Sequence, residues 1–571
     1  MSTLKGLSVA RYLTRALAFL GTTAFFGISS YAAPTVTVIA PKAGTSAGSP
    51  VFYEAYATSS ACTKGIASMR IYSANNVTAY SVSGAHLETF IKLAPGTYNT
   101  VVQAWDNCGG VSKTPITLTV TSTAGVSVFL PNTTSSSHPV HIAASAQNSA
   151  CAAGINAIRI YTADRVSPYT VNSNRLDAYL TLVPGTYKLT VQAWDNCGHV
   201  YKLQFNQPVT TTPDAYLYAV NAPSNAPSDI YQFKIASNGF LKNPNGSNAL
   251  PEFAAGSGAG TLVVDPGGWF VYASTVEGIY GYQINQSNGN LVPMQGSPFA
   301  LNDPNNIIPP WIGIDPSGNF LFARYNRDFI PGNLTSYRIN RSSGALTSTG
   351  FVVPTTLNSF AFDFSGQYLY DIDAGSVDGW RINPNTGFLT TLPGSPFPSN
   401  SLAKMYQTTL CSTGGYLYAG GSDNSGNGQD GAIVSFSINY STGVLTELPS
   451  SPLITHGWQP WKVLADTQTR FIWSWQVGLN RGIVAYDITP GTGDLTPSAF
   501  FSQTDPDYVN AWVEDHSGKY VFTGYIGWDF LNGKPGVSSW PISGNGDLLS
   551  QTIFFTKNPI GSVAVARQSP N

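Results

Sequence analysis

The chain has 571 residues, and 28 basic against 30 acidic residues leave it a formal net charge of −2. Only 10% of its residues are charged, which excludes the broad basic face that neutralises nucleic-acid phosphates, so no nucleic-acid partner is expected. The length allows several domains. Abundant Gly, Ser, Thr, Asn and aromatic residues, without long stretches of helical periodicity, indicate an all-β protein.

Residues 1–33 have the features of an export signal. Basic residues precede a short apolar run from Ala16 to Ile28, and small residues follow in Ser30-Tyr31-Ala32. The alternative is an uncleaved membrane anchor, but the apolar run is short for a bilayer span. We expect cleavage near Ala32 or Ala33 and a secreted, periplasmic or cell-surface protein with no membrane span in its mature chain.

Two copies of one module follow, at residues 34–122 and 123–211. The segment Val-Gln-Ala-Trp-Asp-Asn-Cys-Gly occurs at residues 102–109 and again at residues 191–198. Each copy contains short alternating segments typical of strands in an immunoglobulin-like β-sandwich. The modules resemble the bacterial immunoglobulin-like domains that precede larger exported domains, and this resemblance implies a role in spacing or adhesion.

Four cysteines occupy equivalent positions in the two modules. Cys62 and Cys151 follow an early strand, whereas Cys108 and Cys197 follow a late strand whose loop lies at the same end of such a sandwich. We therefore predict a Cys62–Cys108 and a Cys151–Cys197 disulfide, which an exported chain permits. Zinc or redox pairs are the alternative, but no CxxC motif supports them. No metal site and no cofactor are expected.

Residues 212–571 repeat one pattern seven times. An apolar strand leads through a turn such as Asp315-Pro316-Ser317-Gly318 into an aromatic strand, and a later turn ends in Gly-x-Leu, as in Gly344-Ala345-Leu346. A period of roughly 50 residues with four short strands predicts a seven-bladed β-propeller. The first repeat lacks its opening strand, and Gly561–Ala566 provides a matching strand at the C-terminal end. The last strand should therefore close the ring.

This combination of turns and strands resembles the lactonase-like seven-bladed propellers, which include a 6-phosphogluconolactonase and a fungal muconate-lactonising enzyme. The resemblance implies the propeller fold and, as a possible activity, lactone hydrolysis. The phosphogluconolactonase branch has a His-Pro-His stretch ahead of an opening strand. In a comparable place this chain has His456-Gly457-Trp458-Gln459-Pro460, with one histidine.

The candidate site lies on the face opposite the short turns, where the long and dissimilar loops gather. We call this the variable-loop face. His456 is the candidate general base, with Asp507 to orient it and Arg324 or Lys404 to neutralise an anion. The further binding candidates are two tryptophans able to stack on flat ligands and two polar residues beside them: Trp458, Trp461, Tyr508 and Asn510.

Three functions are compatible with this sequence. The leading hypothesis is an exported propeller that binds a small molecule, a carbohydrate or a protein on the variable-loop face and is carried on two spacer modules. The second is an extracellular lactone or ester hydrolase, in which His456 activates water and a cation stabilises the oxyanion. The third is a structural cell-surface protein.

Overall fold

The computed structural model describes residues 32–131, 136–162, 169–222, 227–247, 249–302, 308–327, 330–355, 359–373, 375–423, 431–455, 458–478, 482–502, 509–525, 534–549 and 552–567. Strands make up nearly all of the regular structure in these ranges, which confirms the predicted all-β class. Within the same ranges, no helix has the length and apolar character needed to cross a membrane.

Sandwich 1 consists of a three-stranded sheet in the order β1-β3-β6 and a five-stranded sheet in the order β2-β8-β7-β4-β5. Its inner faces are apolar because side chains alternate across each strand, as at Met69 and Ile71. The strands are β1 (Thr35–Ala40), β2 (Thr45–Ala47), β3 (Val51–Thr58), β4 (Ile66–Ala74), β5 (Val77–Ser83), β6 (His86–Ile91), β7 (Gly96–Asp106) and β8 (Val111–Val120).

Sandwich 2 repeats this arrangement with the sheets β9-β11-β14 and β10-β16-β15-β12-β13. Its strands are β9 (Gly125–Leu130), β10 (Ser136–Ser137), β11 (Val140–Gln147), β12 (Ile155–Tyr161), β13 (Tyr169–Val171), β14 (Arg175–Leu180), β15 (Gly185–Asp195) and β16 (Val200–Thr210). The shared strand order agrees with a duplication. The immunoglobulin-like designation of the two sandwiches stays a prediction.

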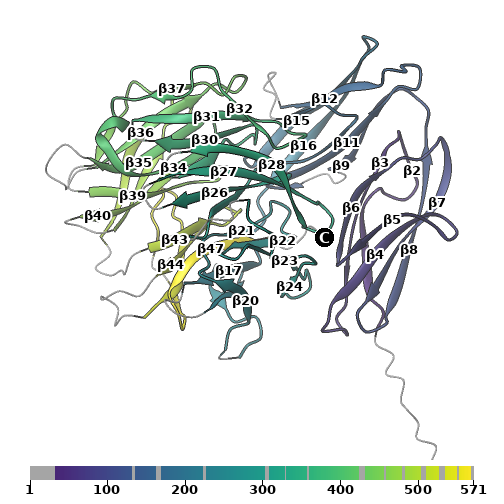
Figure 1. Cartoon of the computed structure of the whole chain (residues 1–571), viewed down its shortest axis with the longest axis horizontal. Helices are drawn as coiled ribbons and strands as arrows, with labels where there is room; N and C mark the ends of the chain where they lie inside the picture. The colour runs from purple at the N-terminus through teal and green to yellow at the C-terminus, as the bar shows by residue number, and fades with distance from the viewer. Residues whose placement is uncertain are drawn as a thin grey trace, which may run out of the picture.

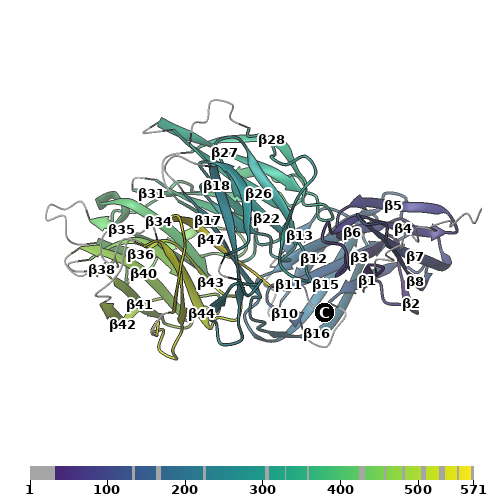
Figure 2. The ribbon, with the colours of Figure 1, turned by 90° about the horizontal axis from the view of Figure 1, so that it is seen from below.

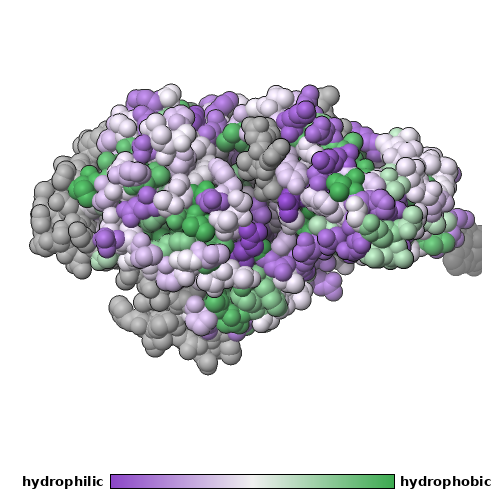
Figure 3. Space-filling view, turned by 90° about the horizontal axis from the view of Figure 1, so that it is seen from above, coloured by the Kyte–Doolittle hydropathy of each residue, from purple (hydrophilic) through white to green (hydrophobic). Residues whose placement is uncertain are grey.

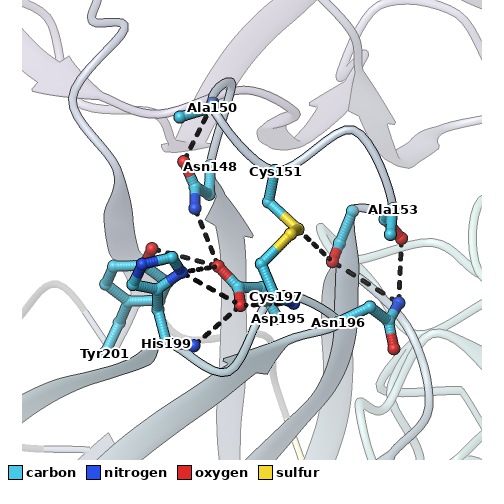
Figure 4. Close-up of a disulfide and its surroundings, with 10 residues drawn as sticks. Asn148, Ala150, Cys151, Ala153, Asp195, Asn196, Cys197, His199 and Tyr201 are labelled. Carbon is cyan, nitrogen blue, oxygen red and sulfur yellow. Dashed lines mark hydrogen bonds and ion pairs between the residues drawn. A yellow bond between two sulfur atoms is a disulfide. The ribbon is translucent and has the colours of Figure 1, made fainter.

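Both predicted disulfides are present, joining Cys62 to Cys108 and Cys151 to Cys197. Each one links two loops at the same end of its sandwich. Figure 4 shows the second bridge beside Asp195, whose carboxylate accepts hydrogen bonds from the Asn148 amide at 2.7 Å and the Tyr201 hydroxyl at 3.2 Å. The bridge and the carboxylate together hold the two loops in place.

Seven sheets of four or five strands make up the propeller in the described ranges, and each sheet is one blade. From the innermost strand outward, blade 1 contains β47 (Ile560–Ala566), β17 (Tyr216–Asn221), β18 (Pro227–Ile235) and β19 (Leu241–Lys242), with β20 (Glu252–Ser257) beside β18. Blade 2 contains β21 (Leu262–Val264), β22 (Phe270–Ser274), β23 (Ile279–Ile284) and β24 (Leu291–Pro293). Blade 3 contains β25 (Trp311–Ile314), β26 (Phe320–Arg327), β27 (Ile330–Ile339) and β28 (Leu346–Thr355).

The remaining blades follow the same order. Blade 4 contains β29 (Phe360–Phe362), β30 (Tyr368–Asp373), β31 (Ser376–Ile382) and β32 (Leu389–Thr391), with β33 (Phe397–Pro398) beside β31. Blade 5 follows a 3₁₀ turn, η2 (Leu402–Lys404), and contains β34 (Met405–Thr413), β35 (Tyr416–Asp423), β36 (Gly431–Ile438), β37 (Leu445–Glu447) and β38 (Leu453–Thr455). Blade 6 contains β39 (Trp458–Ala465), β40 (Phe471–Gly478), β41 (Gly482–Ile488) and β42 (Leu495–Ser502). Blade 7 contains β43 (Val509–Glu514), β44 (Tyr520–Tyr525), β45 (Gly536–Pro541) and β46 (Thr552–Phe555).

The Gly-x-Leu turn and the aromatic strand form a contact that recurs between neighbouring blades. The Tyr272 hydroxyl of blade 2 donates a hydrogen bond to the Gly344 carbonyl of blade 3 at 2.6 Å. Gly344 has φ +74°, and a Cβ there would lie 2.6 Å from the Phe270 ring. Equivalent bonds join four other pairs of neighbouring blades: Tyr218 to Gly289, Tyr370 to Gly443, Tyr418 to Gly493 and the Trp473 indole to Gly546.

The C-terminal strand closes the ring as the sequence predicts. β47 pairs antiparallel with β17, so that Val565 lies opposite Leu217 and Val563 lies opposite Ala219. Because β47 is the innermost strand of blade 1, the two ends of the propeller sequence are held in one sheet. This pairing leaves no open edge between the first and last blades.

The sandwiches lie against the face of the propeller that carries its short turns (Figure 1, Figure 2). The Asn319 amide of blade 3 donates to the Tyr169 hydroxyl at 3.2 Å and to the Asp177 carbonyl at 3.1 Å in sandwich 2. In sandwich 1, the Tyr80 hydroxyl donates to Ser342 of blade 3 at 3.1 Å. The two modules expected to act as spacers are thus packed onto the propeller.

Candidate functional site

The variable-loop face is the end of the propeller channel where the innermost strands begin. Of the residues predicted there, His456, Asp507 and Tyr508 lie outside the described residues. Lys404 and Trp458 are described by their backbones, in η2 and at the start of β39. Three predicted side chains are therefore described at this end: Arg324, Trp461 and Asn510.

Arg324 lies near the end of β26, opposite Trp311 at the start of the innermost strand β25. Its side chain is buried, and its Nε lies 3.4 Å from Asp371 Oδ2 in blade 4. Burial lowers the pKa of Arg324, and the Asp371 carboxylate opposes that shift. The guanidinium is thus charge-balanced between two blades, so its role toward a substrate stays a prediction.

Trp461 is half-buried and packs edge-on against Trp475, with ring centroids 6.0 Å apart. Its indole nitrogen donates to Gln459 Oε1 at 3.3 Å. These contacts hold the Trp461 ring within blade 6. The ring also packs against a hydrophobic cluster that blades 6 and 7 share. Stacking of Trp461 on a ligand stays a prediction.

Asn510 and Lys462 connect the innermost strands of three consecutive blades. The Asn510 amide donates to the carbonyls of Ile560 and Gly561 in blade 1, at 3.2 and 3.3 Å. The carbonyl of Asn510 accepts a hydrogen bond from the Lys462 ammonium of blade 6. Because innermost strands line the channel of a propeller, this chain of contacts lies beside the channel.

Lys462 was not among the residues predicted from the sequence. Burial lowers its pKa to about 8, so its ammonium loses its proton far more readily than an exposed lysine does. The sequence does show a single cationic residue within the apolar segment Trp458–Ala465. It does not show that this residue contacts Asn510, which lies 48 residues further along the chain. Tertiary structure brings the two residues together.

Hydroxyl groups also join innermost strands of neighbouring blades. Thr409 Oγ1 accepts from the Val463 amide at 3.2 Å, and Ser562 Oγ accepts from the Leu262 amide at 3.0 Å. These bonds hold together the innermost strands of blades 5 and 6 and of blades 1 and 2.

A cavity of about 450 Å³ lies at the opposite end, between sandwich 2 and blades 3 to 6. Its walls are largely apolar, and the sequence did not indicate it because it exists only when the two parts are docked. Residues from both parts line it, among them Thr162, Leu182, Tyr187, Phe364, Tyr440 and Asp466.

The face seen in Figure 3 carries separate hydrophobic patches among hydrophilic side chains. Fractional exposure identifies exposed apolar side chains that belong to different elements, such as Trp311 on β25 and Phe555 on β46. Isolated apolar residues of this kind are normal on a protein surface.

Comparison with known proteins concerns mainly the propeller. Residues 212–359 match the family described as Lactonase, 7-bladed beta-propeller. Among solved structures, the periplasmic gluconolactonase of Pseudomonas aeruginosa is 14% identical, with a TM-score of 0.46, over 62% of this chain and 100% of that one. A proposed 6-phosphogluconolactonase from Bacteroides fragilis is 14% identical, with a TM-score of 0.43, over 63% of this chain and 99% of that one.

A protein of unknown function from Desulfotomaculum acetoxidans is 12% identical, with a TM-score of 0.44, over 61% of this chain and 99% of that one. No curated protein sequence matches the chain. The family match covers residues 212–359, and the seven blades closed by β47 agree with the seven-bladed propeller that the family description names.

Proposed function

We propose that the propeller binds and hydrolyses a small lactone or related ester at the variable-loop end of its channel. The observation that carries this proposal is Lys462, a buried amine with its pKa lowered to about 8 on an innermost strand. The match of residues 212–359 to a lactonase family supports lactones as the class to test first.

Hydrolysis would begin with attack of water on the ester carbonyl, which creates a negatively charged tetrahedral oxygen. At neutral pH most Lys462 side chains still carry a proton, so the ammonium can stabilise that oxygen in a partly desolvated site. His456 precedes β39 by two residues and is proposed as the base that accepts the proton of the water. Collapse of the intermediate would break the bond between the acyl carbon and the ring oxygen, and the proton held by His456 would pass to that oxygen to give a hydroxy acid.

Lys462 takes the role that the sequence suggested for Arg324 or Lys404. The Arg324 guanidinium already faces Asp371, whereas Lys462 contacts the uncharged carbonyl of Asn510. A carboxylate offsets most of the charge of a neighbouring cation, whereas a neutral carbonyl does not. Lys462 therefore attracts a ligand anion more strongly than Arg324 does.

Binding without turnover is the second candidate. The Arg324–Asp371 ion pair favours binding without turnover. Arg324, which the sequence suggested as a cation for the reaction, already interacts with a carboxylate. Trp458, Trp461, Tyr508 and Asn510 would then contribute a binding surface for a small molecule, a carbohydrate or a protein.

The test uses the full mature chain in a hydrolysis screen with lactones and esters. The wild type should open at least one lactone, and Lys462→Met should lower kcat by about 10²-fold or more, as expected when an oxyanion-stabilising group is removed. His456→Ala should also lower kcat. Lys519→Met changes an exposed lysine beyond the short-turn end of β43 and should leave the rate unchanged.

The same variants distinguish the two candidates. If no substrate turns over, calorimetry measures binding of the screened lactones. Binding that Lys462→Met weakens would support the second candidate, binding without turnover. Equal turnover by wild type and Lys462→Met would contradict the hydrolytic mechanism.

Export is proposed for the whole protein. Two disulfides support it, because such bonds persist in oxidising compartments outside the cytoplasm. Amino-terminal sequencing of the mature protein tests the expected cleavage near Ala32 or Ala33. Recovery of the intact first residues from the cytoplasm would contradict this proposal.

A further inference from the structure

A buried ionic cluster lies where sandwich 1, sandwich 2 and the propeller meet, and we call it the junction cluster. Sandwich 1 contributes Glu54 from β3 and both His86 and Glu88 from β6. His141 and Asp177 come from β11 and β14 of sandwich 2. Two propeller residues, Asp265 after β21 and Arg341 after β27, complete it.

Two carboxylates of this cluster are placed opposite each other by the strand register. Glu54 pairs with Glu88 across β3 and β6, and the two residues are only 2% and 4% exposed. Like charges directly opposite on a sheet are destabilising, and burial removes the water that would screen them. His86 lies two positions before Glu88 on β6, so its side chain projects from the same face of the sheet.

The cations in the cluster offset only part of the negative charge. His141 faces carboxylates through both ring nitrogens, with Nδ1 3.2 Å from Glu54 Oε2 and Nε2 2.8 Å from Asp177 Oδ1. Arg341 Nε lies 3.0 Å from Glu88 Oε1. With all carboxyl groups ionised, the four acids of the cluster and these two cations leave a formal charge of −2.

The His86 side chain takes no part in the hydrogen bonds of the junction cluster. It is 2% exposed, and neither of its ring nitrogens has a hydrogen-bond partner. Its Nε2 lies 3.6 Å from Glu54 Oε1 and 3.7 Å from Glu88 Oε2. Glu88 Oε2 also lacks a hydrogen-bond partner.

These separations are too long for hydrogen bonds, which span about 2.7–3.2 Å. They are close to those of two ligands of one metal ion, because donors at 2.0–2.2 Å from a tetrahedral zinc ion lie about 3.3–3.6 Å apart. The donor atoms of Glu54, His86 and Glu88 all lie within 4.8 Å of one another. The three side chains therefore offer donor atoms at separations suited to one ion.

We propose that Glu54, His86 and Glu88 bind one divalent metal ion of the zinc type. The imidazole ligand favours zinc or a related transition metal over calcium or magnesium, which prefer oxygen ligands. Burial raises the pKa of Glu88, and an ion bound here stabilises the ionised form of both opposed carboxylates. Glu54 Oε1, His86 Nε2 and Glu88 Oε2 are the three protein ligand atoms of this ion.

The propeller covers this site. The Trp269 ring stacks on the His86 ring, with centroids 3.9 Å apart, and Trp269 belongs to the turn between β21 and β22. An ion bound here thus stabilises the docking of sandwich 1 on the propeller. Because its ligands are buried, the ion is taken up during folding and exchanges slowly with solvent.

The experiment measures metal content in the full mature chain produced with added zinc. After extensive dialysis, wild type should retain about one equivalent of zinc by elemental analysis, and His86→Gln less than about a tenth of an equivalent. Asp177→Asn is the matched control, since it removes a carboxylate of the same cluster outside the proposed ligand set. This control should retain about one equivalent.

A second measurement on the wild type remains decisive if His86→Gln does not fold. Zinc X-ray absorption of the dialysed wild type should report one nitrogen and several oxygen ligands from histidine and carboxylates. Wild-type protein that is folded but holds less than about a tenth of an equivalent would overturn the proposal. So would a sulfur-containing ligand set, or equal zinc in wild type and a folded His86→Gln.

Discussion

At the scale of single residues, two buried cations near the variable-loop face are stabilised in different ways. Arg324 faces the Asp371 carboxylate, so its charge is offset by an opposite charge. Lys462 instead contacts the backbone carbonyl of Asn510, and none of the ion pairs among the described residues involves it. A buried ammonium without a carboxylate costs folding free energy, which is why burial lowers its pKa.

Lys462→Met should therefore stabilise the folded protein at pH 7 by up to about 3 kcal/mol, because each unit of pKa difference corresponds to about 1.4 kcal/mol. The folded pKa of about 8 lies below the ordinary value of 10.5, so between these values the unfolded chain holds a proton that the folded chain has lost. Wild-type stability consequently rises with pH across this window, and the advantage of Lys462→Met shrinks. Urea unfolding at pH 7 and pH 10 measures both effects. A difference that is independent of pH would contradict the assignment.

At the scale of elements, the contact between neighbouring blades explains two motifs that are far apart in each repeat. The aromatic strand contributes a donor, such as the Tyr272 hydroxyl, and the Gly-x-Leu turn contributes a carbonyl, such as that of Gly344. Glycine is needed at this position for two reasons, a left-handed φ and the closeness of the Phe270 ring. Blade packing thus depends on the absence of a side chain at one turn position.

Gly344→Ala should destabilise the propeller by about 2–4 kcal/mol, because it combines backbone strain with overpacking against Phe270 and Met294. Gly350→Ala is the matched control. Gly350 has nearly the same φ, +75°, but nothing lies within 4 Å of a Cβ there. The control should lose only about 1 kcal/mol. Thermal unfolding of both variants measures the difference, and equal losses would rule out the packing explanation.

At the scale of the whole molecule, the ring closure and the docked sandwiches make one body from distant parts of the chain. β47 pairs with β17 although more than half of the chain separates the two strands. The Asn319 amide and the Ser342 hydroxyl attach the short-turn face to sandwiches 2 and 1 respectively. The sandwiches are therefore part of the architecture of the propeller and extend its short-turn face.

Removal of residues 558–571 should open blade 1, because β17 would lose its inner partner β47 and expose backbone donors and acceptors along that edge. Aggregation and a lowered thermal midpoint should follow, as measured by light scattering and calorimetry. Removal of residues 568–571 alone retains all of β47 and is the control. A fully soluble, equally stable protein without residues 558–571 would contradict closure by β47.

The sequence by itself determined the seven blades, their closing strand and both disulfides. These features follow from turn chemistry, strand alternation and internal repetition, all of which are local or recur within the chain: Gly344 and its equivalents mark each blade, and Cys62 and Cys108 recur as Cys151 and Cys197.

Only the tertiary structure decided which charged side chains meet. The partner of Lys462 lies in the next blade, that of Arg324 lies across a blade interface, and His86 reaches Trp269 only when sandwich 1 docks on the propeller. Each contact depends on side chains brought together by packing between separate sheets, for which neither sequence spacing nor periodicity carries a signal. The docking of the sandwiches onto the short-turn face was unpredictable for the same reason.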